Sequence, residues 1–225
     1  MGEKVTFYSD GRTCEGYLAK PALGKALAVV VLQEWWGLVP HVMDVCDRFA
    51  KEGFIAIAPD LYHGKTTTAP DEAGRLLMEL DVERANTEIA GAANYVLSRP
   101  ECSSKRFGVV GFCMGGALAQ YAATSNSKVG AAASFYGGFK KVPLKWESLK
   151  APVLLIYGEM DEGVPASEAA PLEKKLKNLG KKVETVIYRG APHGFFNDSR
   201  PTQYREECAR DAWKRTVDLL KANVK

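Results

Sequence analysis

The sequence predicts a protein of the α/β class, in which helices cover both faces of a mostly parallel sheet. Runs such as Ala28-Val29-Val30-Val31-Leu32 are apolar without interruption, which is typical of parallel strands buried on both sides. Longer segments with a helical spacing of apolar residues separate these runs. With 225 residues, 46% hydrophobic and 25% charged, the chain suits one substantial core, so we expect a single domain over residues 1–225.

The strands and helices can be assigned in order along the chain. An opening antiparallel pair, 5–8 and 15–19, is expected around the turn at Asp10-Gly11. The other strands are expected at 26–33, 54–58, 106–110, 131–136, 152–157 and 183–188. Helices are expected at 42–51, 82–97, 115–124, 166–179 and 203–220. The stretch 61–101 is thus predicted to hold one long helix and no lid domain, which favours small substrates.

The segment Gly111-Phe112-Cys113-Met114-Gly115 has the pattern of a nucleophile elbow, with cysteine at the position where serine is usual. An apolar strand precedes it and a helix rich in small residues follows it, as this motif requires. Glycines on either side are needed because the strand and helix backbones close on each other at such a turn. The alternative is that Cys113 is a buried core cysteine and that the glycines mark an ordinary turn.

Two later motifs favour the catalytic interpretation. Asp161 follows the strand expected at 152–157, and His193 follows the strand expected at 183–188. A nucleophile, an acid and a histidine in this order are typical of the α/β-hydrolase fold, here with an eight-stranded sheet. His193 would take the thiol proton, and Asp161 would orient the imidazole. Alternatively, both are ordinary loop residues; of the other two histidines, His41 and His63, neither follows a late strand.

The loop after the strand at 26–33 carries a further acid, Glu34, in the segment Glu34-Trp35-Trp36-Gly37. In α/β-hydrolases this loop supplies one N–H of the oxyanion hole, so the N–H groups of Trp35 and Met114 are predicted to form it. Glu34 could accept the Cys113 proton, or it could be a solvated loop acid. Aromatic residues just past strand ends are candidate substrate contacts, although such residues often cap the core instead: Trp35, Trp36, Tyr62, Tyr136, Phe195 and Phe196.

Five motifs together resemble those of the dienelactone hydrolase family, also called carboxymethylenebutenolidases. The resemblance spans nearly the whole chain, and it implies the α/β-hydrolase fold and the opening of an enol-lactone ring. It also implies that Cys113, His193 and Asp161 form the triad. In the resting enzyme, the resemblance implies that Glu34 forms a hydrogen bond with the thiol. Substrate binding would then displace Glu34, which would deprotonate the cysteine. The motifs are Glu34-Trp35-Trp36-Gly37, Pro59-Asp60-Leu61-Tyr62, Gly111-Phe112-Cys113-Met114-Gly115-Gly116, Gly158-Glu159-Met160-Asp161 and Pro192-His193-Gly194-Phe195.

One position departs from the family pattern. In dienelactone hydrolases two arginines hold the substrate carboxylate, one of them four residues after the catalytic histidine, where this chain has Asn197. Arg200 could replace that arginine, and Arg75 is the candidate for the other. The resemblance therefore implies hydrolysis of an ester or lactone, whereas dienelactone itself as the substrate is left open.

Composition narrows the function classes. A net charge of +3 with scattered lysine pairs indicates solvated surfaces and does not favour nucleic-acid binding. No apolar run approaches the roughly 18 residues of a membrane helix, and the N-terminal residues lack a secretory signal pattern. The five cysteines have no C-x-x-C spacing, which favours a reducing, cytoplasmic setting. We expect no metal or cofactor, no membrane partner, and a monomer or small homo-oligomer.

The leading hypothesis is therefore a hydrolase of small lactones or esters that acts through a thioester on Cys113. A carboxylesterase or thioesterase with a broad acyl range is the first alternative. The second is a non-catalytic protein with a hydrolase fold whose thiol senses oxidants or electrophiles.

Overall fold

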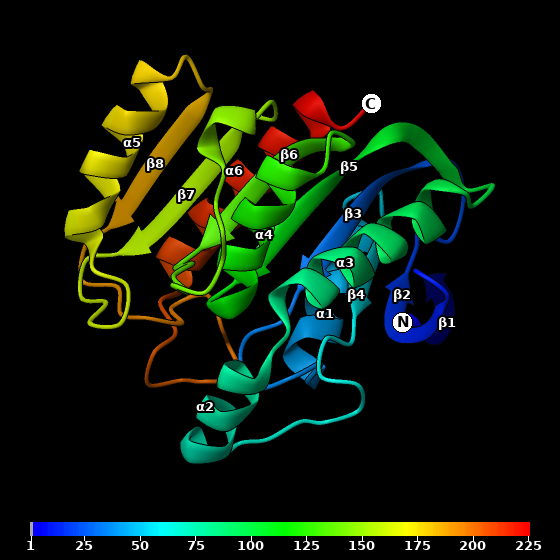
Figure 1. Ribbon diagram of the computed structural model, residues 1–225, viewed down its shortest axis with the longest axis horizontal. Helices are drawn as coiled ribbons and strands as arrows, with labels where there is room; N and C mark the ends of the chain where they lie inside the picture. The colour runs from blue at the N-terminus through cyan, green and yellow to red at the C-terminus, as the bar shows by residue number, and fades with distance from the viewer. Residues whose placement is uncertain (1) are drawn as a thin grey trace.

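Eight strands form one twisted sheet in the computed structural model, which describes residues 2–225. The strand order is β1-β2-β4-β3-β5-β6-β7-β8 (Figure 1). The pairs β1–β2 and β2–β4 are antiparallel, and all the others are parallel. The opening antiparallel pair and the mostly parallel sheet agree with the prediction. The strands are β1 (Glu3–Ser9), β2 (Arg12–Ala19), β3 (Ala26–Leu32), β4 (Phe54–Pro59), β5 (Cys102–Phe112), β6 (Val129–Phe135), β7 (Val153–Gly158) and β8 (Val183–Tyr188).

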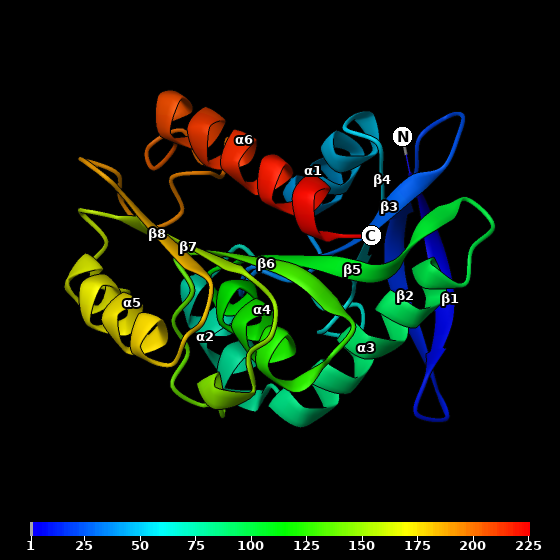
Figure 2. The same cartoon turned by 90° about the horizontal axis from the view of Figure 1, so that it is seen from above.

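Helices cover both faces of this sheet. Figure 2 shows α1 and α6 on one face and α3, α4 and α5 on the other. Each face has its own apolar cluster, because the buried strands contribute alternate side chains to the two sides. The helices are α1 (Pro40–Lys51), α2 (Pro70–Glu79), α3 (Val82–Leu97), α4 (Met114–Ser125), α5 (Ala169–Asn178) and α6 (Glu206–Asn223), with short 3₁₀ turns η1 (Trp146–Ser148) and η2 (Ala166–Glu168).

The region between β4 and β5 differs from the prediction, because it holds two helices where one was expected. Pro70 begins α2, a position at which proline is favoured since its missing N–H is not needed there. Asp81 then caps α3 by accepting the N–H of Arg84 at 3.0 Å. Leu80 between the helices has an extended ψ of 122°, which ends α2. Both signals are present in the sequence, and the prediction of a single helix was wrong.

The turn between β1 and β2 agrees with the prediction. Asp10 and Gly11 both have a positive φ, 48° and 72°, which suits the tight turn that joins paired strands. Ser9 pairs with Arg12 across it.

Among the helices of residues 2–225, none is long and apolar enough to cross a membrane.

Parallel pairing decides where the candidate catalytic residues lie. The strands β3, β5, β7 and β8 run in the same direction in one sheet, so their carboxyl ends meet at one edge. Glu34 follows β3, Cys113 follows β5, Asp161 follows β7 and His193 follows β8. Open α/β sheets bind their ligands at this edge.

Candidate active site

Cys113 occupies the turn between β5 and α4 with φ 55° and ψ −118°. Backbone held in a sparsely populated region of this kind costs about 1–3 kcal/mol, and such strain clusters at functional sites. The turn is possible because a Cβ on Gly111 would lie 1.9 Å from the carbonyl oxygen of Gly115. A Cβ on Gly115 would in turn lie 2.5 Å from the carbonyl oxygen of Leu32. The glycines thus let α4, β5 and β3 close on one another around a half-buried cysteine.

His193 and Asp161 form a hydrogen-bonded pair beside this turn. The distance from His193 Nδ1 to Asp161 Oδ2 is 2.7 Å. The other oxygen, Oδ1, accepts the backbone N–H groups of Gly163 at 2.9 Å and Val164 at 2.8 Å. The Asp161 side chain is fully buried, whereas that of His193 is 36% exposed. The acid is therefore held rigidly, and the imidazole reaches the surface.

The surroundings favour the charged form of His193. Burial lowers the pKa of the imidazole, but the Asp161 carboxylate and the Cys113 sulfur together outweigh it and raise the pKa to about 10. The ring packs against that of Tyr136, with 4.8 Å between centroids. An imidazolium at neutral pH can stabilise a thiolate beside it and can later donate its proton.

Glu34 is buried, with 3% of its surface exposed, and is held by two neutral groups. The Tyr136 hydroxyl donates to Oε1 at 3.4 Å, and the Asn197 amide donates to Oε2 at 2.8 Å. Within residues 2–225 no lysine or arginine forms an ion pair with it. Burial, followed by the charges of Glu34 and Cys113, raises the pKa of Tyr136 well above its usual range, so the phenol remains a donor.

The role of Asn197 as a partner of Glu34 was not predicted from the sequence, where this residue stands out only as a departure from the family pattern. Its Oδ1 accepts the N–H of Ser199 at 3.1 Å and the Ser199 hydroxyl at 2.5 Å. With the oxygen occupied in this way, the amide nitrogen must face Glu34. The only sequence signal is the Asn-x-Ser spacing, which is typical of many turns.

The two N–H groups predicted for the oxyanion hole, those of Trp35 and Met114, donate no hydrogen bond to any residue in the described range 2–225. The Met114 N–H opens α4, where backbone N–H groups are free to bind an anion. Met114 also contacts Tyr62, whose hydroxyl lies 3.3 Å from its sulfur. Burial and the charge of Cys113 raise the pKa of Tyr62, which lies near the nucleophile.

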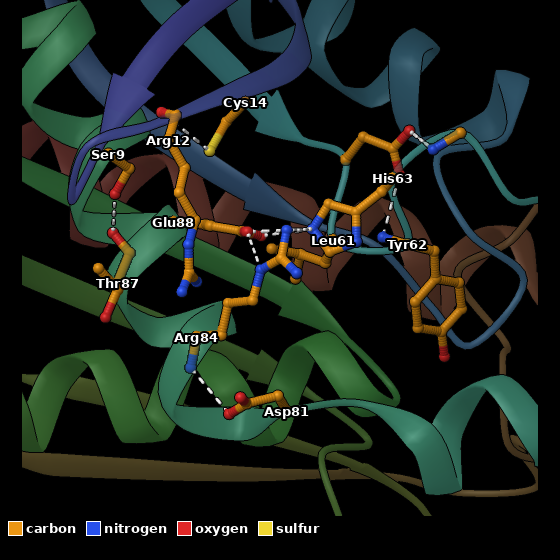
Figure 3. A network of polar contacts seen from close by, with 12 residues as sticks. Ser9, Arg12, Cys14, Leu61, Tyr62, His63, Asp81, Arg84, Thr87 and Glu88 are labelled. Carbon is orange, nitrogen blue, oxygen red and sulfur yellow. Dashed lines mark hydrogen bonds and ion pairs between the residues drawn. The ribbon is translucent and has the colours of Figure 1, made fainter.

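The loop that carries Tyr62 is anchored on its far side by a polar network. His63 Nε2 lies 3.0 Å from Glu88 Oε1, and Arg84 Nε donates to the same oxygen at 2.7 Å. Figure 3 shows His63 turned toward Glu88 and Arg84, whereas the Tyr62 ring points the other way. Asp60 closes the loop by accepting the Tyr62 N–H at 3.1 Å.

The other predicted substrate contacts differ in their exposure and in their neighbours. Trp36 is 7% exposed, and the Arg200 guanidinium lies 4.3 Å from its ring centroid. Trp35 meets Trp36 edge to face and is half-buried. Arg75 is exposed on α2. The two arginines thus have different surroundings, and only Arg200 packs on an aromatic residue of the Glu34 loop.

Two aromatic residues predicted as substrate contacts lie in the core instead. Phe195 has no exposed surface and packs against Tyr136 and Tyr188, so a substrate has no access to its side chain. Phe196 is 2% exposed and stacks on Phe112. Tyr136 is itself fully buried and meets the site only through its hydroxyl and the ring face toward the histidine. The core-capping alternative therefore holds for both phenylalanines.

Comparisons with known proteins identify the family. The model of the dienelactone hydrolase family matches residues 14–224. Protein usf of Aquifex pyrophilus is 37% identical over 98% of both chains. A protein of Aquifex aeolicus, provisionally named a carboxymethylenebutenolidase, is 34% identical over 100% of both. Among solved structures, a Klebsiella pneumoniae protein provisionally named a dienelactone hydrolase superposes with a TM-score of 0.89, at 28% identity and 98% coverage of both chains. The chain is therefore an ester hydrolase with the α/β-hydrolase fold, and it belongs to the dienelactone hydrolase family.

Proposed function

We propose that this protein hydrolyses small lactones or esters through a thioester on Cys113, with His193 and Asp161 completing a catalytic triad. The main support is the 2.7 Å bond between His193 and Asp161 at the sheet edge where Cys113 sits in a strained turn. A structural histidine would not need an acid held by two backbone N–H groups, which keeps the carboxylate aimed at the ring.

In the first step the Cys113 sulfur attacks the carbonyl carbon, forming a C–S bond while the bond to the leaving oxygen breaks. The imidazolium of His193 donates its proton to that oxygen, which leaves as an alcohol or enol. In the second step water attacks the thioester, and His193 takes up the water proton. The carboxylic acid is released and the sulfur returns as thiolate paired with the imidazolium. In a lactone the leaving oxygen remains attached to the acyl group.

The oxyanion formed in each step would be bound by the N–H groups of Trp35 and Met114, which have no partner within residues 2–225. Glu34 would accept the thiol proton when substrate displaces it toward Cys113, and it would return that proton to the sulfur when the product leaves. Its two neutral donors, Tyr136 and Asn197, suit this role, because a cation at the same place would hold the carboxylate more tightly than they do.

Uncharged esters with a broad acyl range are the second candidate substrates. The observation that favours them is the exposed position of Arg75 on α2, which leaves Arg200 as the one candidate arginine packed on the Glu34 loop. A panel that pairs each carboxylate-bearing lactone with its methyl ester separates the two candidates. Preference for the free carboxylate, lost in Arg200→Gln, would favour the first; preference for the methyl ester favours the second.

The triad itself is tested with nitrophenyl acetate. Cys113→Ala and His193→Ala should abolish turnover with the fold retained, and Cys102→Ala, half-buried outside the site, is the matched control. Mass spectrometry of quenched wild-type protein should find one acetyl group on Cys113. Full turnover in either site variant contradicts the proposal. Stoichiometric loss of the thiol without turnover would instead favour the sensor alternative.

A further inference from the structure

A cavity of about 670 Å³ lies near the Cys113 turn, on the face of the sheet that α4 and α5 cover. Its size falls within the roughly 300–1,000 Å³ typical of ligand sites. Residues of α2, the loop after β6, β7 and α5 line it, and most of them are apolar: Leu77, Phe139, Val142, Trp146, Tyr157 and Leu172. Figure 2 shows α2, α4 and α5 together on this face.

The glycines after β6 allow this cavity to form next to the acid loop. A Cβ on Gly138 would lie 2.6 Å from the Val164 side chain, so the two loops could not approach each other with a larger residue there. Met78 at the rim is 62% exposed, one of few large apolar side chains so open to solvent in residues 2–225. Exposed apolar surface around a concave site is typical of a binding surface.

The cavity adjoins the triad but contains none of its side chains. Neither Cys113 nor His193 lines it, whereas Gly163 and Val164, whose N–H groups hold Asp161, form part of its wall. A ligand could therefore occupy this cavity while Cys113 reacts, and its binding does not depend on the proposed chemistry.

Charge at the mouth of the cavity points to the kind of ligand. Lys140 and Lys141 are exposed there, and Glu168 is the one acid of the lining. The Lys141 ammonium donates a hydrogen bond to the Met78 carbonyl. Of the two lysines, Lys140 is therefore the one with no hydrogen bond or ion pair within residues 2–225. Gln120 adds an amide that is 4% exposed, whose nitrogen donates to Ser134 at 2.8 Å. An apolar interior with a cationic rim is complementary to an anionic amphiphile.

We propose that this cavity binds an anionic amphiphile, with a medium-length apolar chain among the aromatic and aliphatic side chains and its carboxylate at Lys140. The probe is dansylaminoundecanoic acid, used below its micelle concentration. Trp146, which is 5% exposed in the cavity wall, should transfer excitation energy to the bound dansyl group. Titration should give a saturable signal with one site per chain, and decanoate should displace the probe.

Two variants test the two parts of the site. Lys140→Glu should weaken probe binding about fivefold by reversing the charge at the rim, whereas Lys145→Glu, also exposed but outside the cavity, should leave it unchanged. Leu172→Asp should weaken binding about tenfold by placing a charge against the apolar chain, while Leu179→Asp, beyond the lining, should not.

Alkylation of Cys113 locates the bound probe. If the probe occupies the proposed cavity, its affinity should survive alkylation, since Cys113 does not line that cavity. Absence of saturable binding, equal losses in the control variants, or loss of binding on alkylation would each overturn the proposal. The experiment measures binding of the probe and not turnover. Absence of probe binding would therefore not contradict the proposed triad, and an inactive triad would not contradict the proposed binding site.

Discussion

Two histidine–aspartate pairs in this protein have similar geometry and opposite character. His193 lies 2.7 Å from Asp161, and His41 lies 3.2 Å from Asp198. Asp161 is held by backbone N–H groups alone, so its charge acts on the histidine, whereas Asp198 is also bonded to Arg48. The pKa of His193 rises to about 10, while burial lowers that of His41 in spite of the nearby acids. A contact between histidine and acid therefore does not by itself indicate catalysis.

The free ring nitrogen distinguishes the two pairs further. The Nε2 atom of His41 is buried without a partner within residues 2–225, and its ring packs edge to face against both Phe112 and Phe196. The His193 side chain is 36% exposed, so its ring reaches the surface beside Cys113. The pairs also have opposite linkage to pH. Because the pKa of His193 is raised on folding, its contribution to the free energy of unfolding is complete below pH 6.5 and is lost as the pH rises toward 10. Because the pKa of His41 is lowered on folding, its contribution is complete above pH 6.5 and is lost as the pH falls below that value.

Exchange of each histidine for alanine should separate the pairs most strongly. His193→Ala should lower kcat/KM for an activated ester by about 10³-fold or more, because acid and base are both lost. His41→Ala should leave kcat/KM within about threefold, since no substrate reaches that ring. Steady-state rates with circular dichroism as the folding control decide this. A comparable loss in His41→Ala would mean that the comparison is wrong.

Asp161→Asn should have the next largest effect. We expect a loss of about 10²-fold in kcat, together with a shift of the alkaline limb of the pH–rate profile to lower pH. The sign follows because Asp161 raises the pKa of His193, so its neutral replacement lets the imidazole lose its proton at lower pH. The measurement is kcat/KM between pH 6 and 11. An alkaline limb that stays in place would show that Asp161 does not control this proton.

His41→Ala should have its main effect on folding. Removal of a buried ring that packs against Phe112 and Phe196 leaves a cavity, and we expect a loss of about 2–4 kcal/mol in the free energy of unfolding. Urea denaturation at pH 8 measures it. At pH 5 the difference from wild type should be smaller, since the wild type loses the contribution of its neutral histidine there. An equal difference at both pH values would contradict the proposed linkage.

Asn197→Ala tests how the buried carboxylate of Glu34 is held. It leaves Glu34 with Tyr136 as its remaining donor, and an unsatisfied buried group costs about 1–3 kcal/mol in unfolding free energy. Asn126→Ala, half-buried at the C-terminal end of α4 with its side chain accepting the Lys128 N–H, serves as the comparison. We also expect the rate of Cys113 alkylation by iodoacetamide to change, because Glu34 becomes free to move. An unchanged stability and alkylation rate would exclude a holding role for Asn197.

The smallest effect is expected at the third pair, His63 and Glu88. His63→Gln should alter the free energy of unfolding by less than about 1 kcal/mol, because the ring is 44% exposed and Arg84 still neutralises the buried Glu88. Activity should stay within about twofold. Thermal unfolding together with the ester assay measures both. A large loss of activity would instead assign this loop a part in positioning Tyr62.

The fold was predictable because it depends on patterns that are local in the sequence. Uninterrupted apolar runs are typical of strands buried on both sides. The glycines around Cys113 permit one tight turn of the backbone, because a Cβ on Gly111 or Gly115 would lie only 1.9 Å or 2.5 Å from a carbonyl oxygen. The second helix between β4 and β5 was not predicted, although Pro70 and Asp81 mark its boundaries. Only Ala73 and Leu76 of this helix are buried, so its apolar pattern is weak.

The candidate site was predictable only in part. The order of Cys113, Asp161 and His193 indicates which side chains share a sheet edge, and their catalytic roles stay a proposal. Phe195 could not be assigned from its motif, because the direction of a side chain just past a strand depends on the packing of other elements, here Tyr136 and Tyr188.

The sequence by itself determined the class of fold, the family and the edge of the sheet at which the reactive groups gather, because strand direction and motif order follow from residues close together in the chain. Tertiary structure alone decided which partner each acid has. Glu34 and Asn197 are 163 residues apart in sequence and 2.8 Å apart in space. Only the packed fold brings such distant groups together, and with them it decides whether a buried carboxylate is neutralised by a cation or held by neutral donors.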